Sequence, residues 1–216
     1  VWGGAPAIFD MRKGSTPMGA IETAMIDASY AQVGKSLNIP THCYLGATES
    51  KIVDAQAGME SGMSALVGAL AGINMISGAG MLDFLACHSP EKLTIDAEAI
   101  GMAKRMLEGV QARTETLATV MFEGINFKGD FLKQRITREL FSKEQYLPSD
   151  VIDRDSIRGW QASGRMDTFA RAKIRTNKLL DEYQRPQMDP AKEKALVNMM
   201  ESLAKEAGMN TLPALE

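Results

Sequence analysis

The first half of the chain alternates short apolar runs with longer helical patterns, and this alternation constrains the fold more than any other feature. Apolar runs at 6–10, 41–46 and 73–77 have the length of buried strands. Helical patterns cover about 17–36, 54–70 and a stretch that begins at Ser89. Strands and helices that alternate at this spacing predict a parallel sheet with right-handed crossovers, so the expected fold class is α/β.

Local signals predict where two of these helices begin. Ser15 or Thr16 can cap the first helix, with Pro17 at its first position, where a missing N–H costs nothing. Ser89-Pro90-Glu91 gives the third helix a cap, a first-position proline and an early acid. The spacing predicts that this helix buries an apolar stripe made of Ile95, Ala99, Met102 and Met106.

The second half carries no strand signal after about Arg113. Helical patterns follow at 115–124, 130–141, 156–163, 167–183 and 189–206. We therefore expect βα units over 1–113 and a helical C-terminal region of the same domain over 114–216. Three βα units do not complete an eightfold barrel, which needs about 250 residues. The pattern fits either a small open α/β domain or the trailing part of a barrel.

Composition excludes several classes of function. The 216 residues are 45% hydrophobic and 24% charged with a net charge of -3, so no bulk attraction to nucleic acid or anionic lipid is expected. No apolar stretch reaches the roughly 18 residues of a membrane helix. Cys43 and Cys87 lack ligand-like spacing, which favours the cytoplasm and no bound metal. Because the chain begins at Val1 rather than Met, we expect its true N-terminus to lie upstream.

Polar residues follow each predicted strand, at the edge where parallel α/β folds place their reactive groups. Asp10 and Arg12 follow the first strand, and His88 lies in the loop before the third helix. The group after the second strand consists of Glu49, Ser50, Lys51, Asp54, Gln56 and Glu60, and the third strand is also followed by Asp83 and Cys87.

Each candidate also has a structural interpretation. Asp10 and Arg12 can form an ion pair that locks their loop, and acids that open the second helix can simply complement its dipole. His42 lies inside a predicted strand, where a packed histidine is the simpler interpretation. A zinc site from His42-Cys43 and Cys87-His88 is disfavoured, because neighbours in a strand point to opposite faces.

Several strings, in order along nearly the whole chain, resemble the trimethylamine methyltransferase family. The strings are Asp10-Met11-Arg12, the run from Ser50 to Glu60, Gly78-Ala79-Gly80-Met81-Leu82, Phe131-Leu132, Arg138-Glu139, and Pro148 with Asp153-Arg154 and Trp160. The resemblance implies the C-terminal part of a (β/α)₈ TIM-type barrel. It also implies a partner, a corrinoid protein whose cob(I)alamin accepts a methyl group from an amine.

The resemblance also bears on the substrate. Family members that use trimethylamine carry pyrrolysine, which we place near the Asp54–Glu60 stretch, whereas this sequence shows standard residues there. A quaternary ammonium is already a charged leaving group, so the resemblance implies a demethylase of a quaternary amine such as glycine betaine.

We expect this substrate to meet residues from all three loops. His88, near a helix N-terminus, is suited to hold the betaine carboxylate, and aromatic rings favour the cation. The candidate substrate-binding residues are His88, Asp10, Arg12, Gln56 and Glu60, with Tyr44, Phe84 and Phe9 as an aromatic wall. Gly58, Gly78 and Gly80 are the candidates for contact with the corrinoid, although Gly78-Ala79-Gly80 lacks the full phosphate-binding pattern.

Two alternatives to this interpretation remain open at this point. The substrate could be trimethylamine or another methylated amine, or the chain could be a non-catalytic, amine-binding paralogue. A partial barrel would also leave strand edges exposed, so we expect homo-oligomers or aggregates from the isolated chain.

Overall fold

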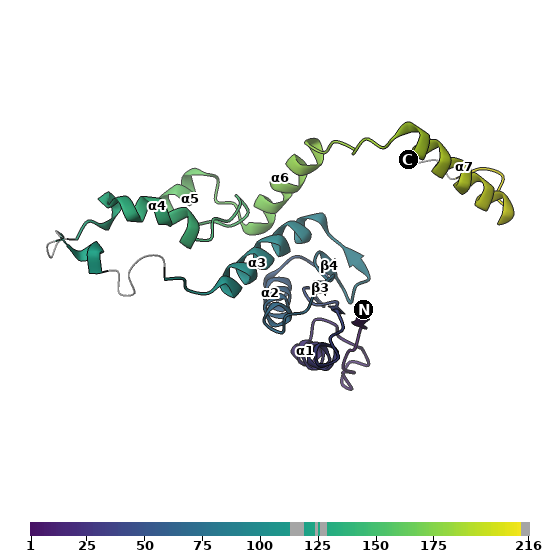
Figure 1. Cartoon of the computed structure of the whole chain (residues 1–216), viewed down its shortest axis with the longest axis horizontal. Helices are drawn as coiled ribbons and strands as arrows, with labels where there is room; N and C mark the ends of the chain where they lie inside the picture. Colours follow the sequence, from purple (N-terminus) through teal and green to yellow (C-terminus); the bar gives the residue numbers. More distant parts are fainter. Residues whose placement is uncertain (113–118, 124, 126–128, 213–216) are drawn as a thin grey trace. The chain divides into compact units, whose positions relative to one another are not determined.

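The computed structural model describes residues 1–112, 119–123, 125 and 129–212. These residues fall into two compact units, Val1–Leu179 and Leu180–Glu216 (Figure 1). The predicted boundary near residue 113 stays a prediction.

The first unit contains a three-stranded parallel sheet with two helical crossovers. Strands β1 (Trp2–Gly3), β2 (Thr41–Cys43) and β3 (Met75–Ile76) lie in the order β1-β2-β3. Helix α1 (Ile21–Ser36) connects the first two strands and α2 (Ala55–Leu70) the next two. The α/β prediction is confirmed as parallel β-α-β units, whereas barrel closure stays a prediction.

The predicted strand at 6–10 is wrong, because the first strand lies earlier in the chain. The Trp2 amide donates to the carbonyl of Pro40 at 2.7 Å, which sets β1 beside β2. Gly3 permits this approach, since a Cβ there would lie 2.9 Å from the Cβ of His42. Pro6 has no backbone N–H to donate to a neighbouring strand, and Asp10 makes only an isolated bridge to Ser15.

The start of α1 also differs from its prediction. The helix begins at Ile21 after Ala20, which makes no side-chain cap, so Ser15 or Thr16 does not cap it. The amides of Met18 and Gly19 instead donate to the carboxylate of Glu49, a residue of the loop after β2. A tertiary contact thus holds the segment that leads into α1, and no side chain caps the helix itself.

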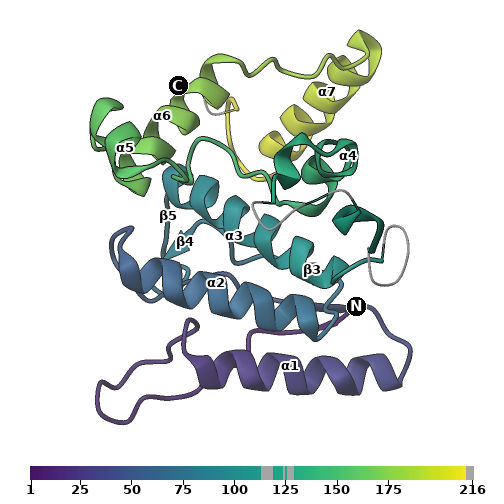
Figure 2. The ribbon, with the colours of Figure 1, turned by 90° about the vertical axis from the view of Figure 1, so that its left-hand side faces the viewer.

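The starts of α2 and α3 (Pro90–Glu108) are confirmed. Asp54 accepts from the Ala57 amide, and Ser89 accepts from the Lys92 amide with Pro90 in the first turn. In Figure 2 the helices α1, α2 and α3 lie side by side, with α2 in the middle. The three helices therefore form one layer of the βα region.

The predicted apolar stripe of α3 is wrong. Met102 and Met106 are 40% and 60% exposed, whereas Lys92 and Asp96 are 1% and 3% exposed. Glu98 and Ala103 are buried as well. The buried polar groups are hydrogen-bonded, which removes the usual cost of placing them inside.

A hairpin that the sequence did not predict precedes α3. Strands β4 (Met81–Leu82) and β5 (Cys87–His88) pair antiparallel. Their connection contains Asp83, Phe84 and Leu85 at φ values of 46°, 61° and 66°. Three consecutive side-chain-bearing residues in the left-handed region are uncommon, so tertiary contacts must hold this turn.

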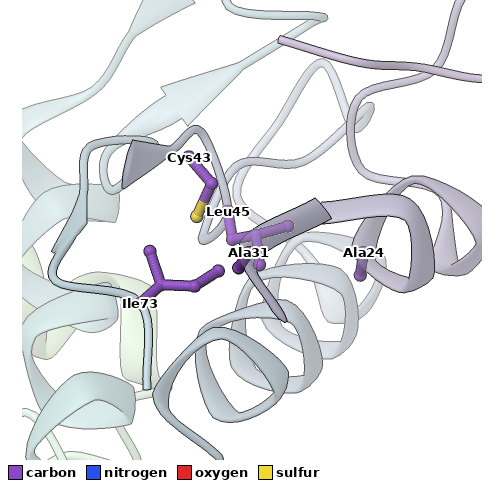
Figure 3. Close-up of a cluster of buried hydrophobic side chains, with 5 residues drawn as sticks. All are labelled: Ala24, Ala31, Cys43, Leu45 and Ile73. Carbon is purple, nitrogen blue, oxygen red and sulfur yellow. The ribbon is translucent and has the colours of Figure 1, made fainter. Parts of the chain in front are cut away.

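The hydrophobic core lies between α1, α2 and the sheet. Figure 3 shows its buried members, which are Ala24 and Ala31 of α1 with Cys43, Leu45 and Ile73. Small side chains on α1 let the helix approach the sheet closely. Burial raises the pKa of the Cys43 thiol to about 11, so this cysteine acts as a core residue.

The rest of the described chain is helical, and no strand follows His88 in it. The elements are η1 (Thr119–Phe122), η2 (Phe131–Lys133), α4 (Arg135–Glu144), α5 (Ile157–Ala162), α6 (Thr168–Asp181) and α7 (Pro190–Glu206). The predicted helices at 156–163, 167–183 and 189–206 are confirmed, and Asp189 caps α7. The helix predicted at 130–141 splits into η2 and α4, and part of that at 115–124 lies outside the described residues. No helix in the described ranges is long and apolar enough to cross a membrane.

Candidate functional site

Two glutamates join the loops that follow β1 and β2. Glu49 Oε1 accepts from the amides of Met18 and Gly19 at 2.7 and 3.2 Å. Glu60 Oε2 accepts from the Thr48 hydroxyl at 2.5 Å and from the Glu49 amide at 2.8 Å. A Cβ on Gly19 would lie 2.8 Å from Glu60 Oε2 and 3.0 Å from the Glu49 nitrogen, so a larger residue would have to displace the Glu60 carboxylate. The loops are therefore held as one surface at the carboxyl ends of the strands.

The second carboxylate oxygen of Glu60 also accepts a hydrogen bond. Gln56, one turn earlier on α2, donates from Nε2 to Glu60 Oε1 at 2.9 Å. Glu60 is half-buried and Gln56 is exposed, so the pair reaches from the helix to the surface. This arrangement fixes a carboxylate at the strand ends, where an ammonium group would be attracted.

Asp10 and Arg12 form the ion pair that the sequence offered as an alternative. The Arg12 guanidinium contacts Asp10 through Nη2 at 2.8 Å and through Nε at 3.1 Å. These hydrogen bonds lower the pKa of Asp10 to about 2. The pair lies in an exposed turn, and the described contacts do not tie it to Glu49 or Glu60. A substrate role for either residue stays a prediction.

His88 is exposed in β5, directly before the residue that caps α3. Its ring lies against Gly80, where a Cβ would be 2.6 Å from His88 Nε2. Gly80 has a φ of +81°, and its carbonyl accepts from the Ser89 amide at 3.0 Å. The hairpin thus presents the imidazole beside a helix N-terminus, as the sequence led us to expect.

Beneath this turn lies a buried ion pair that sequence reasoning missed. Lys92 Nζ donates to Asp96 Oδ2 at 2.5 Å, to Ser61 Oγ at 2.8 Å and to the Gly46 carbonyl at 3.3 Å. Asp96 Oδ2 also accepts from the Gly80 amide at 2.7 Å. Burial raises the pKa of Asp96, although the hydrogen bonds from Gly80 and Lys92 oppose that change. The signal available in the sequence was a Lys and an Asp four residues apart on one helix face.

The aromatic candidates do not form one wall. Tyr44 meets His42 edge-on, with ring centroids 5.0 Å apart, and His42 Nε2 lies 2.7 Å from Ser77 Oγ. His42 is thus a half-buried, packed histidine, as expected. Phe84 is 42% exposed at the hairpin turn and Phe9 is 55% exposed. Cation binding by Tyr44 or Phe84 stays a prediction.

The three candidate glycines differ in the space around them. Gly78 is pressed against the carbonyls of Tyr44 and Leu45, and Gly80 is closed in by His88. A Cβ on Gly58 would have no neighbour within 4 Å, and Gly58 lines a cavity of about 340 Å³. The lining of this cavity includes Lys92 and Asp96. The space beside Gly58 is open, whereas Gly78 and Gly80 are closely packed. Contact of any of the three with a corrinoid stays a prediction.

Comparison with known proteins gives consistent matches. The family model described as "Trimethylamine methyltransferase (MTTB)" matches residues 1–208. The chain is 35% identical to "Trimethylamine methyltransferase MttB2" of Methanosarcina mazei over 88% of its length, and 38% identical to MttB1 of the same organism over 80%. It is 32% identical to "Glycine betaine methyltransferase" of Desulfitobacterium hafniense over 96%. The chain spans 34% to 43% of the length of these relatives.

Proposed function

Because the chain belongs to the trimethylamine methyltransferase family, we propose that it is part of an enzyme that demethylates a quaternary amine such as glycine betaine and passes the methyl group to a corrinoid protein. The observation that carries the choice of substrate is the standard sequence of the Asp54–Glu60 stretch, where the family resemblance places pyrrolysine. The likeness to a glycine betaine methyltransferase over 96% of the chain supports it. The cytoplasm is the proposed location.

The residues present suit a small zwitterion. His88 offers an exposed imidazole beside the N-terminus of α3, where a carboxylate is favoured. Glu60, held by Gln56 and Thr48, supplies a fixed negative charge for the ammonium end. We propose that Tyr44 and Phe84 contribute to the cation face, with Asp10 and Arg12 at the rim. A substrate held by His88 at its carboxylate and by Glu60 at its ammonium group would have one N–CH₃ bond oriented for transfer. Orienting this bond is the main contribution that the protein would make to the reaction.

The corrinoid would supply a strongly nucleophilic cobalt(I) that takes up the methyl group. We propose that Gly58, Gly78 and Gly80 lie near this group; of the three, Gly58 has open space beside it. The task of this chain would be to hold the amine still and to exclude water from it.

The identities favour a second candidate substrate. The two trimethylamine methyltransferases of Methanosarcina mazei are 35% and 38% identical to this chain, above the 32% of the glycine betaine enzyme. Trimethylamine or another methylated amine is therefore the alternative substrate. A paralogue that binds amines without catalysis is the third possibility, and it predicts binding without any change at cobalt.

The test is a spectroscopic assay with the full-length protein. We expect glycine betaine, a corrinoid protein reduced to cob(I)alamin and this protein to yield methylcob(III)alamin, seen in the visible spectrum. His88→Ala should slow the conversion at low betaine concentration, whereas Cys87→Ala, a neighbouring exposed change in the same strand, should not. Conversion with trimethylamine alone would select the second candidate. Amine binding without conversion across quaternary and tertiary amines would select the third.

Self-association is proposed for the isolated chain. In the described residues β1 and β3 pair on one side each, so both outer strands leave backbone groups open. We expect the isolated 216-residue chain to sediment as oligomers or aggregates. A monodisperse monomer that melts cooperatively would contradict this.

A further inference from the structure

The buried ion pair on α3 does more than fill the helix interface. Lys92 and Asp96 are 1% and 3% exposed, and their polar atoms are turned toward backbone groups at the ends of β2 and β3. Lys92 reaches the Gly46 carbonyl, 46 residues earlier in the chain, and Asp96 reaches the Gly80 amide. One ion pair therefore joins two strand-end loops to α3.

Gly80 is the point at which this pair meets the candidate site. Its amide donates to Asp96 at 2.7 Å, and its carbonyl accepts from the Ser89 amide at 3.0 Å. The His88 ring covers its open side, within 2.6 Å of where a Cβ would stand. Both polar groups of this peptide segment are thus committed, so a shift of Asp96 must move Gly80 and the imidazole that rests on it.

We propose that Lys92 and Asp96 are positioning residues, which hold the Gly80 turn and thereby aim the His88 imidazole toward the substrate. This inference rests on the proposed role of His88 in binding the substrate carboxylate. Lys92 keeps the Asp96 carboxylate in place, and Asp96 in turn fixes the Gly80 amide. Neither residue is expected to touch the substrate.

Replacing both partners separates positioning from stability. Removing one partner would leave a buried charge, but an apolar pair of similar volume is often neutral for folding. The Lys92→Met/Asp96→Leu variant removes the acceptor of the Gly80 amide. The Lys92→Met/Asp96→Asn variant keeps an acceptor for that amide and also removes both charges. The two variants therefore differ mainly in the Gly80 hydrogen bond.

Glu98→Gln is the matched control. Glu98 is 7% exposed on the same helix, and it accepts from the Tyr146 hydroxyl at 2.8 Å and the Ser149 amide at 3.1 Å. Its partners lie in the helical region, away from Gly80. Glu98→Gln removes a buried charge from α3, so if the loss of such a charge were enough to move His88, this variant should move it too.

The first measurement is NMR of the imidazole side chains in the full-length protein, with thermal melting recorded beside it. The present chain has two histidines, and His88→Ala identifies the signals of His88. We expect Lys92→Met/Asp96→Leu to shift the His88 signals and leave those of His42 in place. Lys92→Met/Asp96→Asn keeps an acceptor for the Gly80 amide but lacks the lysine that holds it, so it should restore the His88 signals in part. Glu98→Gln should leave them unchanged. Unmoved His88 signals in the leucine variant would overturn the proposal.

The second measurement is the apparent KM for glycine betaine in the methyl-transfer assay. We expect the leucine variant to lose about 10- to 100-fold in kcat/KM, mostly through KM, and the asparagine variant to recover part of it. If the wild-type protein shows no activity, the proposed function is refuted. The NMR result would still decide whether Lys92 and Asp96 position the His88 imidazole. If the leucine variant does not fold, Asp96→Glu replaces it, since this change keeps the charge pair but moves the acceptor by one methylene. Unchanged His88 signals in that variant would also refute the proposal.

Discussion

Helices α1 and α3 each bury a carboxylate, but the two carboxylates differ in their hydrogen-bond partners. Asp96 on α3 meets a lysine, a serine and a backbone amide. Asp27 on α1 is 2% exposed, and its Oδ1 has no hydrogen-bond partner among the described residues. Burial without compensation raises the pKa of Asp27 to about 7. The comparison shows that a buried carboxylate can hold strand-end loops together when other elements supply its hydrogen-bond partners. A buried carboxylate without such partners lowers the stability of the fold.

The largest expected effect on stability comes from breaking the buried ion pair of Lys92 and Asp96. Lys92→Ala leaves Asp96 buried without its cation, and it removes the donor to Gly46. Because an uncompensated buried charge costs about 3 to 5 kcal/mol, the free energy of unfolding should fall by that amount. Urea denaturation of the full-length protein measures it.

Lys104→Ala is the control for that change. Lys104 is exposed on the same helix, and surface changes of this kind stay within about 0.5 kcal/mol. Equal losses in the two variants would show that the Lys92 network contributes nothing of its own.

Asp27→Asn tests whether the unpartnered carboxylate of α1 lowers the stability of the protein. The pKa of Asp27 is raised from 3.8 to about 7 on folding, so the folded protein holds a proton that the unfolded chain releases. Its contribution to stability is therefore full below about pH 4 and is lost as the pH rises toward 7. Relative to the wild type, Asp27→Asn should gain up to about 4 kcal/mol at pH 8 and almost nothing at pH 4.

Urea unfolding at several pH values measures this difference. The variant-minus-wild-type curve isolates Asp27, since other groups titrate equally in both proteins. A curve that is flat from pH 4 to pH 8 would mean that Asp27 has a partner in the full-length protein.

The smallest expected effect concerns the helix starts. α3 has a side-chain cap, Ser89, whereas the residue before α1 is Ala20 without one. Ser89→Ala should cost about 1 kcal/mol, because the Lys92 amide then loses its acceptor. Thermal melting measures the loss. Ser29→Ala, in the exposed middle of α1, should cause none, and an equal loss there would argue against a capping effect.

Residues with local reasons were predicted correctly. Ser89 caps α3 as predicted, because a short side chain can reach an amide three residues onward. The order of strands and helices followed from the length of the apolar runs. The ion pair of Asp10 and Arg12 could also be foreseen, since the two residues lie two positions apart.

Errors arose where a distant partner decided the outcome. The first strand forms at Trp2–Gly3 and not at the apolar run 6–10. The Trp2 amide donates to the Pro40 carbonyl, and the small Gly3 lets this earlier segment lie beside β2. The face of α3 was misassigned because Lys92 finds its acceptors on other elements. The same holds for Gly80, whose contact with His88 depends on a hairpin turn of left-handed residues.

The sequence by itself determined the α/β order, the start of α3 at Ser89 and the resemblance to a methyltransferase family, since each depends on residues close together or on strings in order. The tertiary structure decided which polar groups are buried, because a lysine becomes a core residue only when a carboxylate, a hydroxyl and a carbonyl converge on it. It also decided how the strand-end loops are joined, because the bonds of Glu49 to Met18 and of Lys92 to Gly46 cross 31 and 46 residues of chain.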